Sequence, residues 1–313
     1  MLTRPGRARP GITLLEVLTA IFIMGIGMLA LLTLFPLGAL SMARAIRDDR
    51  AAHIAANAAA VAVAFDLRND DNINKNSKGF SDPNFQIKDS TQPGNPVFVD
   101  PYYVKLGARP LGEWPVGSGA SAKGIKREAP FYVYSGPNIN NALLARWFMF
   151  QDEIEFDPLG GAKGWQAKTV NRPGTYTHAY MVRRPRQDTR ELVELTVVVY
   201  ANRNTTTAEG EQTIFNGSGG PKAMGTQGVP TLKVDWNGQS RPDIRKGTWI
   251  LDTTWDGGKQ SLNGHFYRVE TATDTGATQI TLEVDRPLKA DLNTIVVMQN
   301  VIAVLERGTT WRP

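Results

Sequence analysis

Glu16 is the residue whose type and position most clearly suggest chemistry in this sequence. It ends the segment Gly11-Ile12-Thr13-Leu14-Leu15-Glu16, and the 24 residues from Val17 to Leu40 (40 − 17 + 1 = 24) carry no charge. An ionisable side chain in a membrane-spanning helix costs about 2.5 to 3.5 kcal/mol near the bilayer centre and less near its edge, so it is usually paired or functional. The carboxylate is therefore a candidate for an ion pair. The alternative is that it lies at the interface, near the positive end of its helix dipole.

Residue types that perform catalysis or bind metals are otherwise sparse. The chain has no cysteine, which excludes disulfides, thiolate metal sites and a cysteine nucleophile. Its three histidines, His53, His178 and His265, are far apart, and no pair has the spacing of metal ligands. A Ser-His-Asp triad assembled from distant residues stays open, although it has no local signature here. We therefore expect no enzyme, no catalytic residues, no cofactor and no metal.

Two further motifs are superficial. The segment 70–76 alternates Asp and Asn like a calcium loop, yet Lys75 replaces the required glycine and Ser81 stands where a bidentate acid belongs. The glycines of 117–122 resemble a dinucleotide-binding fingerprint, but no good strand precedes them. Neither motif predicts a ligand.

Composition is that of a globular protein rather than a disordered one. The chain has 313 residues, of which 42% are hydrophobic and 21% charged, and its formal net charge is +5. Three basic residues, Arg4, Arg7 and Arg9, lie in segment 1–11, so the rest has 35 − 3 = 32 basic side chains against 30 acidic ones. This near balance argues against a nucleic-acid-binding surface.

The apolar run predicts a membrane-spanning helix. At about 1.5 Å per residue, Val17–Leu40 would be roughly 36 Å long, which exceeds a hydrocarbon core of about 30 Å. A secretory signal peptide is the competing interpretation, but the run is long for one and no clear A-x-A cleavage site follows. The leader arginines have no acid among them, whereas Arg44, Arg47 and Arg50 are diluted by two aspartates. This asymmetry predicts a cytoplasmic N-terminus, with the rest of the chain outside.

The helix is expected to continue to Arg68, because segment 41–68 contains neither Gly nor Pro. Apolar residues recur at helical spacing on one face of this segment: Ala51, Ile54, Ala58, Val61 and Phe65. We expect this face to pack against a globular domain, with a coiled-coil partner as the less favoured alternative. Residues 12–68 would then form one transmembrane and stalk helix.

These N-terminal features, over residues 4 to 45, resemble the class III signal of type IV prepilins and of type II secretion pseudopilins. The resemblance implies that a prepilin peptidase cleaves the leader 1–11 after Gly11 and that Ile12 is then N-methylated. It also implies that Glu16 pairs with the terminal amine of a neighbouring subunit. Family members usually have Phe at the first mature position and Lys or Arg before the Gly, where this chain has Ile12 and Pro10. The Gly-Ile-Gly segment at 25–27 looks more like a minor subunit.

The fold that the resemblance implies is α+β and pilin-like, with the long N-terminal helix packed on an antiparallel β-sheet. The implied function is a structural subunit of a type IV pilus or type II secretion pseudopilus, anchored by one pass in the inner membrane before assembly. Prepilin peptidase and other pilin or pseudopilin subunits are the implied partners. The alternative is a permanently membrane-anchored, extracytoplasmic ligand- or protein-binding module, whereas an anchored hydrolase has no supporting motif.

The remainder of the chain is expected to be rich in β-structure. Residues 69–215 would form a loop-rich connector and a β-sheet, 216–229 a Gly-rich linker, and 230–313 a further all-β region such as a small sandwich or barrel. We favour a separate module for this last region over additional strands of the same domain. Strands are expected where β-branched and aromatic residues dominate, namely 131–134, 146–150, 177–184, 192–200, 231–236, 248–252, 265–271, 279–284 and 294–305.

Overall fold

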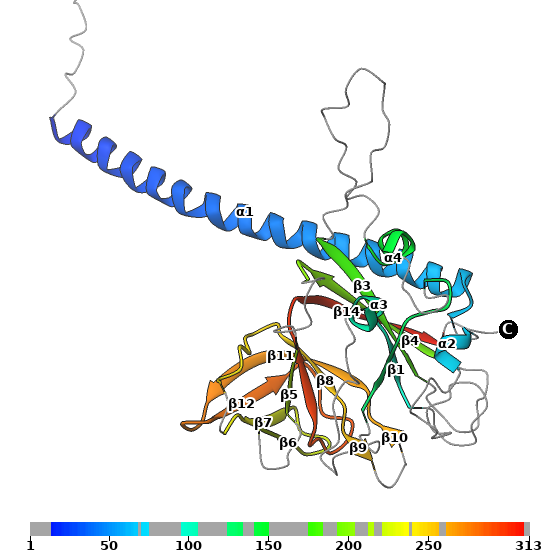
Figure 1. Ribbon diagram of the computed structural model, residues 1–313. Coiled ribbons are helices and arrows are strands. Elements are labelled where there is room, and N and C mark those ends of the chain that lie inside the picture. The colour runs from blue at the N-terminus through cyan, green and yellow to red at the C-terminus, as the bar shows by residue number, and fades with distance from the viewer. Residues whose placement is uncertain are drawn as a thin grey trace, which may run out of the picture. The chain divides into compact units, whose positions relative to one another are not determined.

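The computed structural model describes eleven segments of the chain: residues 14–67, 70–74, 95–105, 124–133, 141–149, 175–183, 193–203, 212–215, 221–237, 240–256 and 261–309. It divides into two compact units, residues 1–50 and 51–313. The long helix α1, Leu14–Ala64, contributes to both units. It is drawn in blue in Figure 1.

The first unit consists, in its described part, of the N-terminal portion of α1. Every residue from 14 to 50 is exposed, and the helix continues through Pro36. The hydroxyl-bearing side chains of this portion donate to carbonyls of their own helix: Thr19 to Leu15 and Glu16 at 3.0 Å, Thr33 to Ala30 at 2.9 Å, and Ser41 to Gly38 at 2.8 Å. These polar groups therefore need no partner outside the helix.

In the second unit, the C-terminal portion of α1 buries a stripe of small residues. Its buried residues are Ala51, Ile54, Ala55, Ala58 and Ala62. They belong to a core cluster that also contains residues of strands β1, β3 and β4. This burial confirms that the alanine-rich face packs against a globular part of the chain. Two of the residues expected on this face are less covered, because Val61 is half-buried and Phe65 is 37% exposed.

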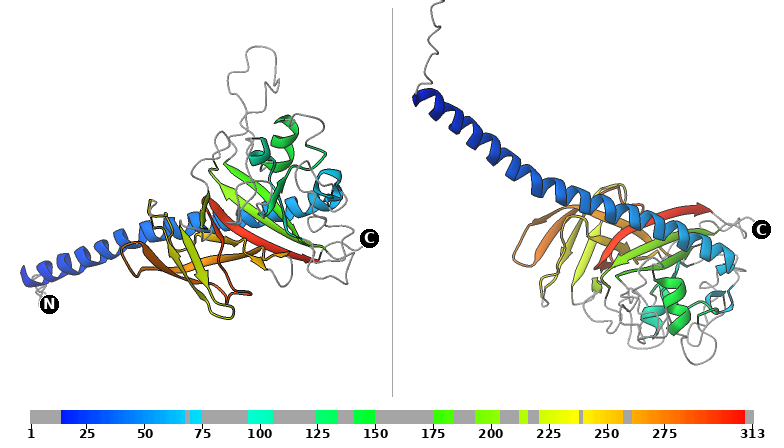
Figure 2. Two further views of the ribbon diagram at one scale, coloured as in Figure 1. Left: turned by 60° about the horizontal axis from the view of Figure 1, so that its bottom comes forward. Right: turned by 90° about the horizontal axis from the view of Figure 1, so that it is seen from above.

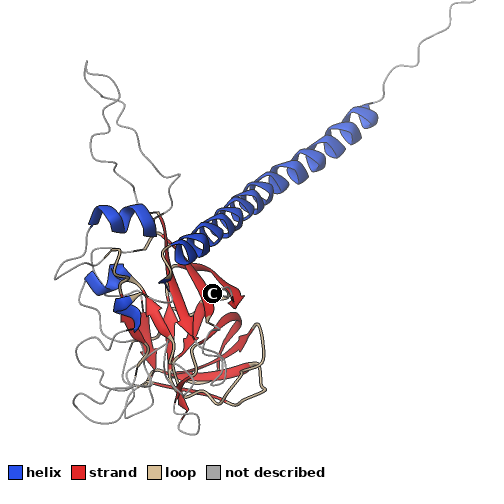
Figure 3. Ribbon diagram, turned by 90° about the vertical axis from the view of Figure 1, so that its right-hand side faces the viewer, coloured by secondary structure: helices blue, strands red, loops and turns tan. Residues whose placement is uncertain are grey.

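The first sheet has five strands in the order β14-β4-β3-β1-β2. Their bounds are β1 Val97–Val99, β2 Lys126–Glu128, β3 Tyr176–Arg183, β4 Glu194–Ala201 and β14 Val301–Thr309. All neighbours are antiparallel except β1 and β2, which are parallel. The short helices of this unit are α2 Asp71–Asn74, α3 Pro101–Lys105 and α4 Asn141–Phe148. Strands, coloured red, predominate in residues 51–313 (Figure 3).

The central strands of this sheet are covered on both faces. Alternate side chains, such as Tyr180 and Val199, join the core that contains α1 residues 51–62. The intervening side chains, such as Met181 and Val198, join a second core with Leu251 and other residues of the second sheet. Six consecutive residues of β3 and six of β4 are therefore buried, rather than every second one.

The second sheet has seven strands in the order β5-β13-β8-β11-β12-β7-β6, and every neighbouring pair is antiparallel. Its strands are β5 Gln212–Phe215, β6 Lys222–Gly225, β7 Thr231–Asp235, β8 Trp249–Asp252, β11 His265–Asp274, β12 Gln279–Val284 and β13 Ile295–Met298. A separate two-stranded sheet pairs β9, Trp255–Asp256, with β10, Ser261–Leu262.

All strands of the second sheet lie between β4 and β14 in the sequence, although β4 and β14 are neighbours in the first sheet. Figure 2 shows β14 in red beside the green strands of the first sheet. Where the chain leaves and returns, the N–H of Ala201 donates to the carbonyl of Asn300 at 2.9 Å. The turns there use positive φ angles, 53° at Asn202 and 62° at Asn300, which asparagine tolerates. The second sheet is thus an insertion between two adjacent strands.

The secondary structure confirms the α+β class and most of the expected strands, and it corrects others. Residues 131–133 form a turn, and 146–148 belong to helix α4 rather than to a strand. The expected linker 216–229 contains strand β6. The expected single strand 294–305 is instead two strands, β13 and β14, that belong to different sheets. The second sheet therefore begins before residue 230, with β5 and β6. The last strand expected in residues 230–313, β14, belongs to the first sheet.

Candidate functional site

The proposed processing residues lie at the start of the chain. Gly11 and Ile12 are outside the described residues. Glu16 occupies the first turn of α1, and its side chain is exposed. An acidic group in this turn is favoured by the partial positive charge of the helix N-terminus.

The surface that follows Glu16 is apolar all round. The described chain has one helix that is long and apolar enough to cross a membrane, and none of its most apolar 18-residue window is buried. Its large side chains, from Leu14 to Met42, are 47% to 80% exposed. Because burying one such side chain contributes about 1.5 to 3 kcal/mol, transfer of this surface from water to an apolar environment is strongly favourable.

Charged residues appear again at the C-terminal end of the apolar portion. Arg44 is the first charged residue after Glu16, and Arg47, Asp48, Asp49 and Arg50 follow. Arg47 Nε lies 3.7 Å from a carboxylate oxygen of Asp48, and both side chains are largely exposed, at 45% and 71%. An exposed pair with this geometry contributes little to stability.

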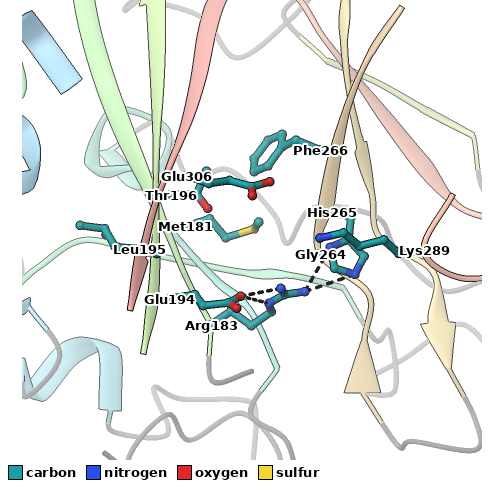
Figure 4. A pocket seen from close by; sticks show the side chains of 11 residues that line it. Met181, Arg183, Glu194, Leu195, Thr196, Gly264, His265, Phe266, Lys289 and Glu306 are labelled. Atoms are coloured by element: carbon teal, nitrogen blue, oxygen red, sulfur yellow. Dashed lines mark hydrogen bonds and ion pairs between the residues drawn. The ribbon is translucent and has the colours of Figure 1, made fainter. Parts of the chain in front are cut away.

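In the second unit, a pocket of about 80 Å³ lies between the two sheets. Its ionisable side chains come from five places: Arg183 from β3, Glu194 from β4, His265 from β11, Lys289 from the loop after β12, and Glu306 from β14. Figure 4 shows Arg183 between Glu194 on one side and His265 on the other. The pocket therefore lies where the inserted sheet meets the first sheet.

Arg183 connects the two sheets through this pocket. Its Nη2 lies 2.5 Å from Glu194 Oε2, and its Nη1 donates to the carbonyl of Asn263 at 3.0 Å. Nη1 also lies 3.2 and 3.3 Å from the two ring nitrogens of His265. The guanidinium is thus held by groups from both sheets. Arg183 therefore cross-links the two sheets.

The histidines belong to three different elements, α1, β3 and β11. His178 is buried between Phe148, whose ring stacks on it at 5.1 Å, and Tyr180, whose hydroxyl lies 3.1 Å from Nε2. Burial lowers the pKa of His178 to about 3, so the ring is neutral and structural. His53 is exposed on α1. Among the described residues, no group of three or more His, Cys, Asp or Glu side chains could hold a metal.

Asp252 is a buried carboxyl group that the sequence did not single out. Its Oδ1 accepts a hydrogen bond from the Thr254 N–H, and its Oδ2 accepts one from Asn263 Nδ2, both at 2.9 Å. Burial raises the pKa of Asp252 to about 7, although these hydrogen bonds oppose the shift. The carboxyl is therefore part of the polar network at the end of β8 and changes charge near neutral pH.

A second charge pair, which is buried, joins Asp100, between β1 and α3, to Arg203, just after β4. The side chains of Arg203 and Asp100 are fully buried and make a bidentate contact, with Nη1 to Oδ1 at 3.0 Å. The Arg203 guanidinium also lies over the rings of Tyr200 and Tyr103, at 4.1 and 4.5 Å. The sequence carries no signal for this pair, because its two members are 103 residues apart. Its role is structural.

Comparison with models of known protein families gives no match, and comparison with curated protein sequences gives none either.

Proposed function

We propose that this chain is a prepilin-like structural subunit, not an enzyme, that is assembled into a type IV pilus or a type II secretion pseudopilus. In this proposal a prepilin peptidase removes residues 1–11 by cutting after Gly11, and Ile12 becomes the N-methylated terminus. The chain is held by one pass in the inner membrane with its N-terminus in the cytoplasm and residues beyond the span outside. It acts as a minor subunit, in contact with other pilin or pseudopilin subunits.

The observation that carries the proposal is the uncovered apolar portion of α1 with a single carboxylate at its start. Residues 14–50 are exposed throughout, and the hydroxyl side chains of Thr19, Thr33 and Ser41 donate to carbonyls of the helix itself. Such a surface suits lipid before assembly and neighbouring helices afterwards, because both environments are apolar. Exchange between them leaves no polar group of these side chains unpaired.

Glu16 is the side chain whose charge is stabilised differently in the two environments, lipid and filament. In lipid its carboxylate lies in the first turn of a membrane helix, where a charged side chain is costly. Pairing with the amine of Ile12 in a neighbouring subunit would remove part of that cost on assembly. The proposed ion pair therefore favours the filament over the membrane-bound monomer.

The Glu16→Gln variant tests this function because it removes the charge and keeps the shape. Coexpressed with a prepilin peptidase and a filament machinery, it should be cleaved like the natural chain, yet its amount in sheared filaments should fall at least tenfold. Asp49→Asn is the matched control, since it removes a carboxylate from the same helix beyond the apolar stretch. Equal incorporation of Glu16→Gln and the natural chain would refute the ion pair.

A permanently anchored binding module is the second candidate, and the inserted second sheet favours it, since insertions between strands often carry binding surfaces. It predicts an uncut leader and no incorporation into filaments. The same coexpression experiment therefore separates the two functions.

A further inference from the structure

The outer end of the apolar portion of α1 has a specific arrangement of arginines. Arg44 and Arg47 are three residues apart, so they lie about 60° apart around the helix and about 4.5 Å apart along it. Both are exposed. Among the described residues no ion pair involves Arg44, and Arg47 has the 3.7 Å contact with Asp48. We call Arg44 and Arg47 the arginine pair.

The position of this pair matches the thickness of a bilayer. From Glu16 to Arg44 there are 44 − 16 = 28 helical steps, and at about 1.5 Å each these span roughly 42 Å. A bilayer including its headgroup regions is about 40 to 45 Å thick. When Glu16 lies at one interface, Arg44 therefore lies among the headgroups of the other leaflet. Arg47 lies about one turn further out.

Lipid phosphate is the partner whose chemistry fits this position. A guanidinium presents a planar fork of N–H donors that matches two phosphate oxygens, and its long apolar stem reaches the headgroup level from a helix in lipid. The exposed Arg47–Asp48 contact is weak enough to exchange for a phosphate. The charge complementarity is thus between two exposed cations and the anionic layer directly beside the apolar span.

We propose that the arginine pair binds phosphate groups of lipids in the outer leaflet and thereby fixes the depth of α1 in the membrane before assembly. This inference rests on the proposed membrane anchoring. It adds a second polar contact, at the end of the span opposite to Glu16, that a subunit must give up when it leaves the bilayer.

The full chain reconstituted into phosphatidylcholine vesicles tests the inference through lipid selectivity. Spin-labelled phosphatidylglycerol and spin-labelled phosphatidylcholine report the relative association of each lipid with the protein by electron paramagnetic resonance. An arginine near an anionic surface contributes roughly a fivefold preference, so the natural chain should favour phosphatidylglycerol at least fivefold. Arg44→Gln/Arg47→Gln should reduce the preference to near onefold. The control Arg241→Gln/Arg245→Gln, which changes two exposed arginines of the second sheet region, should keep it.

The depth of α1 in the bilayer gives a second measurement. The chain has no cysteine, so a single introduced cysteine can carry a nitroxide label at a known position. In the arginine-pair variant, the C-terminal end of the uncharged stretch moves from Ala43 to residue 47, so the centre of the stretch moves by two residues. A nitroxide on Met42→Cys should therefore lie about 3 Å deeper in the bilayer of this variant. An unchanged preference and depth in a chain that resists carbonate extraction would overturn the inference and leave the anchoring intact. If the variant keeps the lipid preference and depth of the natural chain but fails to assemble, the arginine pair contacts a neighbouring subunit instead of lipid. That result would also overturn the inference. Release of the natural chain by carbonate would refute the anchoring itself.

Discussion

Asp252 makes the stability of the second unit depend on pH in a direction that can be tested. The carboxyl is 0% exposed, and it faces the Thr254 N–H and the Asn263 amide at 2.9 Å. Asp252→Asn keeps the shape of the protonated acid but cannot ionise. If the Asn263 amide turns over, the variant makes the same two contacts as the protonated acid. The difference in stability between the natural chain and the variant therefore isolates the ionisation of Asp252.

The sign follows from the raised pKa of Asp252. Its pKa is about 7 in the folded state and 3.8 for the ordinary group. The folded state therefore holds the proton more tightly than the unfolded state, and stability is lost as pH rises from about 4 through 7. Each pKa unit corresponds to 1.36 kcal/mol, so the full loss is about 4 kcal/mol, of which about 2.5 kcal/mol falls between pH 5 and pH 8. In a unit of this size, that loss lowers the Tm by roughly 5 to 10 °C.

Thermal unfolding of the full chain in detergent, followed by circular dichroism at pH 5 and pH 8, measures this effect. Other groups titrate as well, so the relevant quantity is the Tm of the Asp252→Asn variant minus that of the natural chain. We expect this difference to increase by roughly 5 to 10 °C from pH 5 to pH 8. A difference that does not change with pH would refute the reasoning, as would a carboxyl carbon signal of Asp252 that titrates below pH 4 in nuclear magnetic resonance.

Two further substitutions test how the parts of the second unit are held together. Tyr180→Phe removes a hydroxyl that donates to the carbonyl of Ala58 in α1 at 2.9 Å, and it should reduce the free energy of unfolding by about 1 to 3 kcal/mol in urea denaturation. Gly264→Ala places a Cβ 2.7 Å from Pro96 Cγ at a φ of +63°. This variant should lose more free energy of unfolding than Gly228→Ala, where φ is +80° and a Cβ would meet no atom within 4 Å. A Tyr180→Phe variant as stable as the natural chain would mean that the hydroxyl contact contributes nothing, and equal losses for the two glycine variants would contradict the contact with Pro96.

The elements that the sequence predicted are those with strong local patterns. The alanine-rich face of α1 repeats at helical spacing, and its members Ala51, Ile54 and Ala58 are buried as expected. The strand at 192–200 is a run of β-branched residues, and it is β4, buried on both faces. Local sequence is sufficient in these cases because the period of apolar residues directly reflects which face is covered.

The incorrect strand at 146–150 shows how aromatic residues can mislead. Trp147 and Phe148 favoured a strand, but Leu144 and Phe148 are four residues apart and both are buried. This i, i+4 pair is the pattern of a helix, and the helix formers before it extend α4 from Asn141. The tertiary contacts of one helix face outweighed the β-propensity of two residues.

The pairing of β4 with β14 could not be predicted from the sequence. Ala201 and Asn300 are hydrogen-bonded across an insertion that contains the whole second sheet. The signals of turns and strands are local, whereas the choice of a strand's neighbour depends on packing across a long separation. Arg183 and Asp252, two polar groups that bind Asn263, could not be identified from the sequence for the same reason, because their partner lies outside their own strands.

The central claim is that this chain is processed as a prepilin, and the mass of its mature N-terminus tests that claim most directly. The full chain is coexpressed in membranes with a prepilin peptidase, and the protein is analysed by intact-mass and N-terminal peptide mass spectrometry. We predict a chain that begins at Ile12 and carries one added methyl group. A chain that still begins at Met1, or one that is cut anywhere other than after Gly11, would contradict the claim.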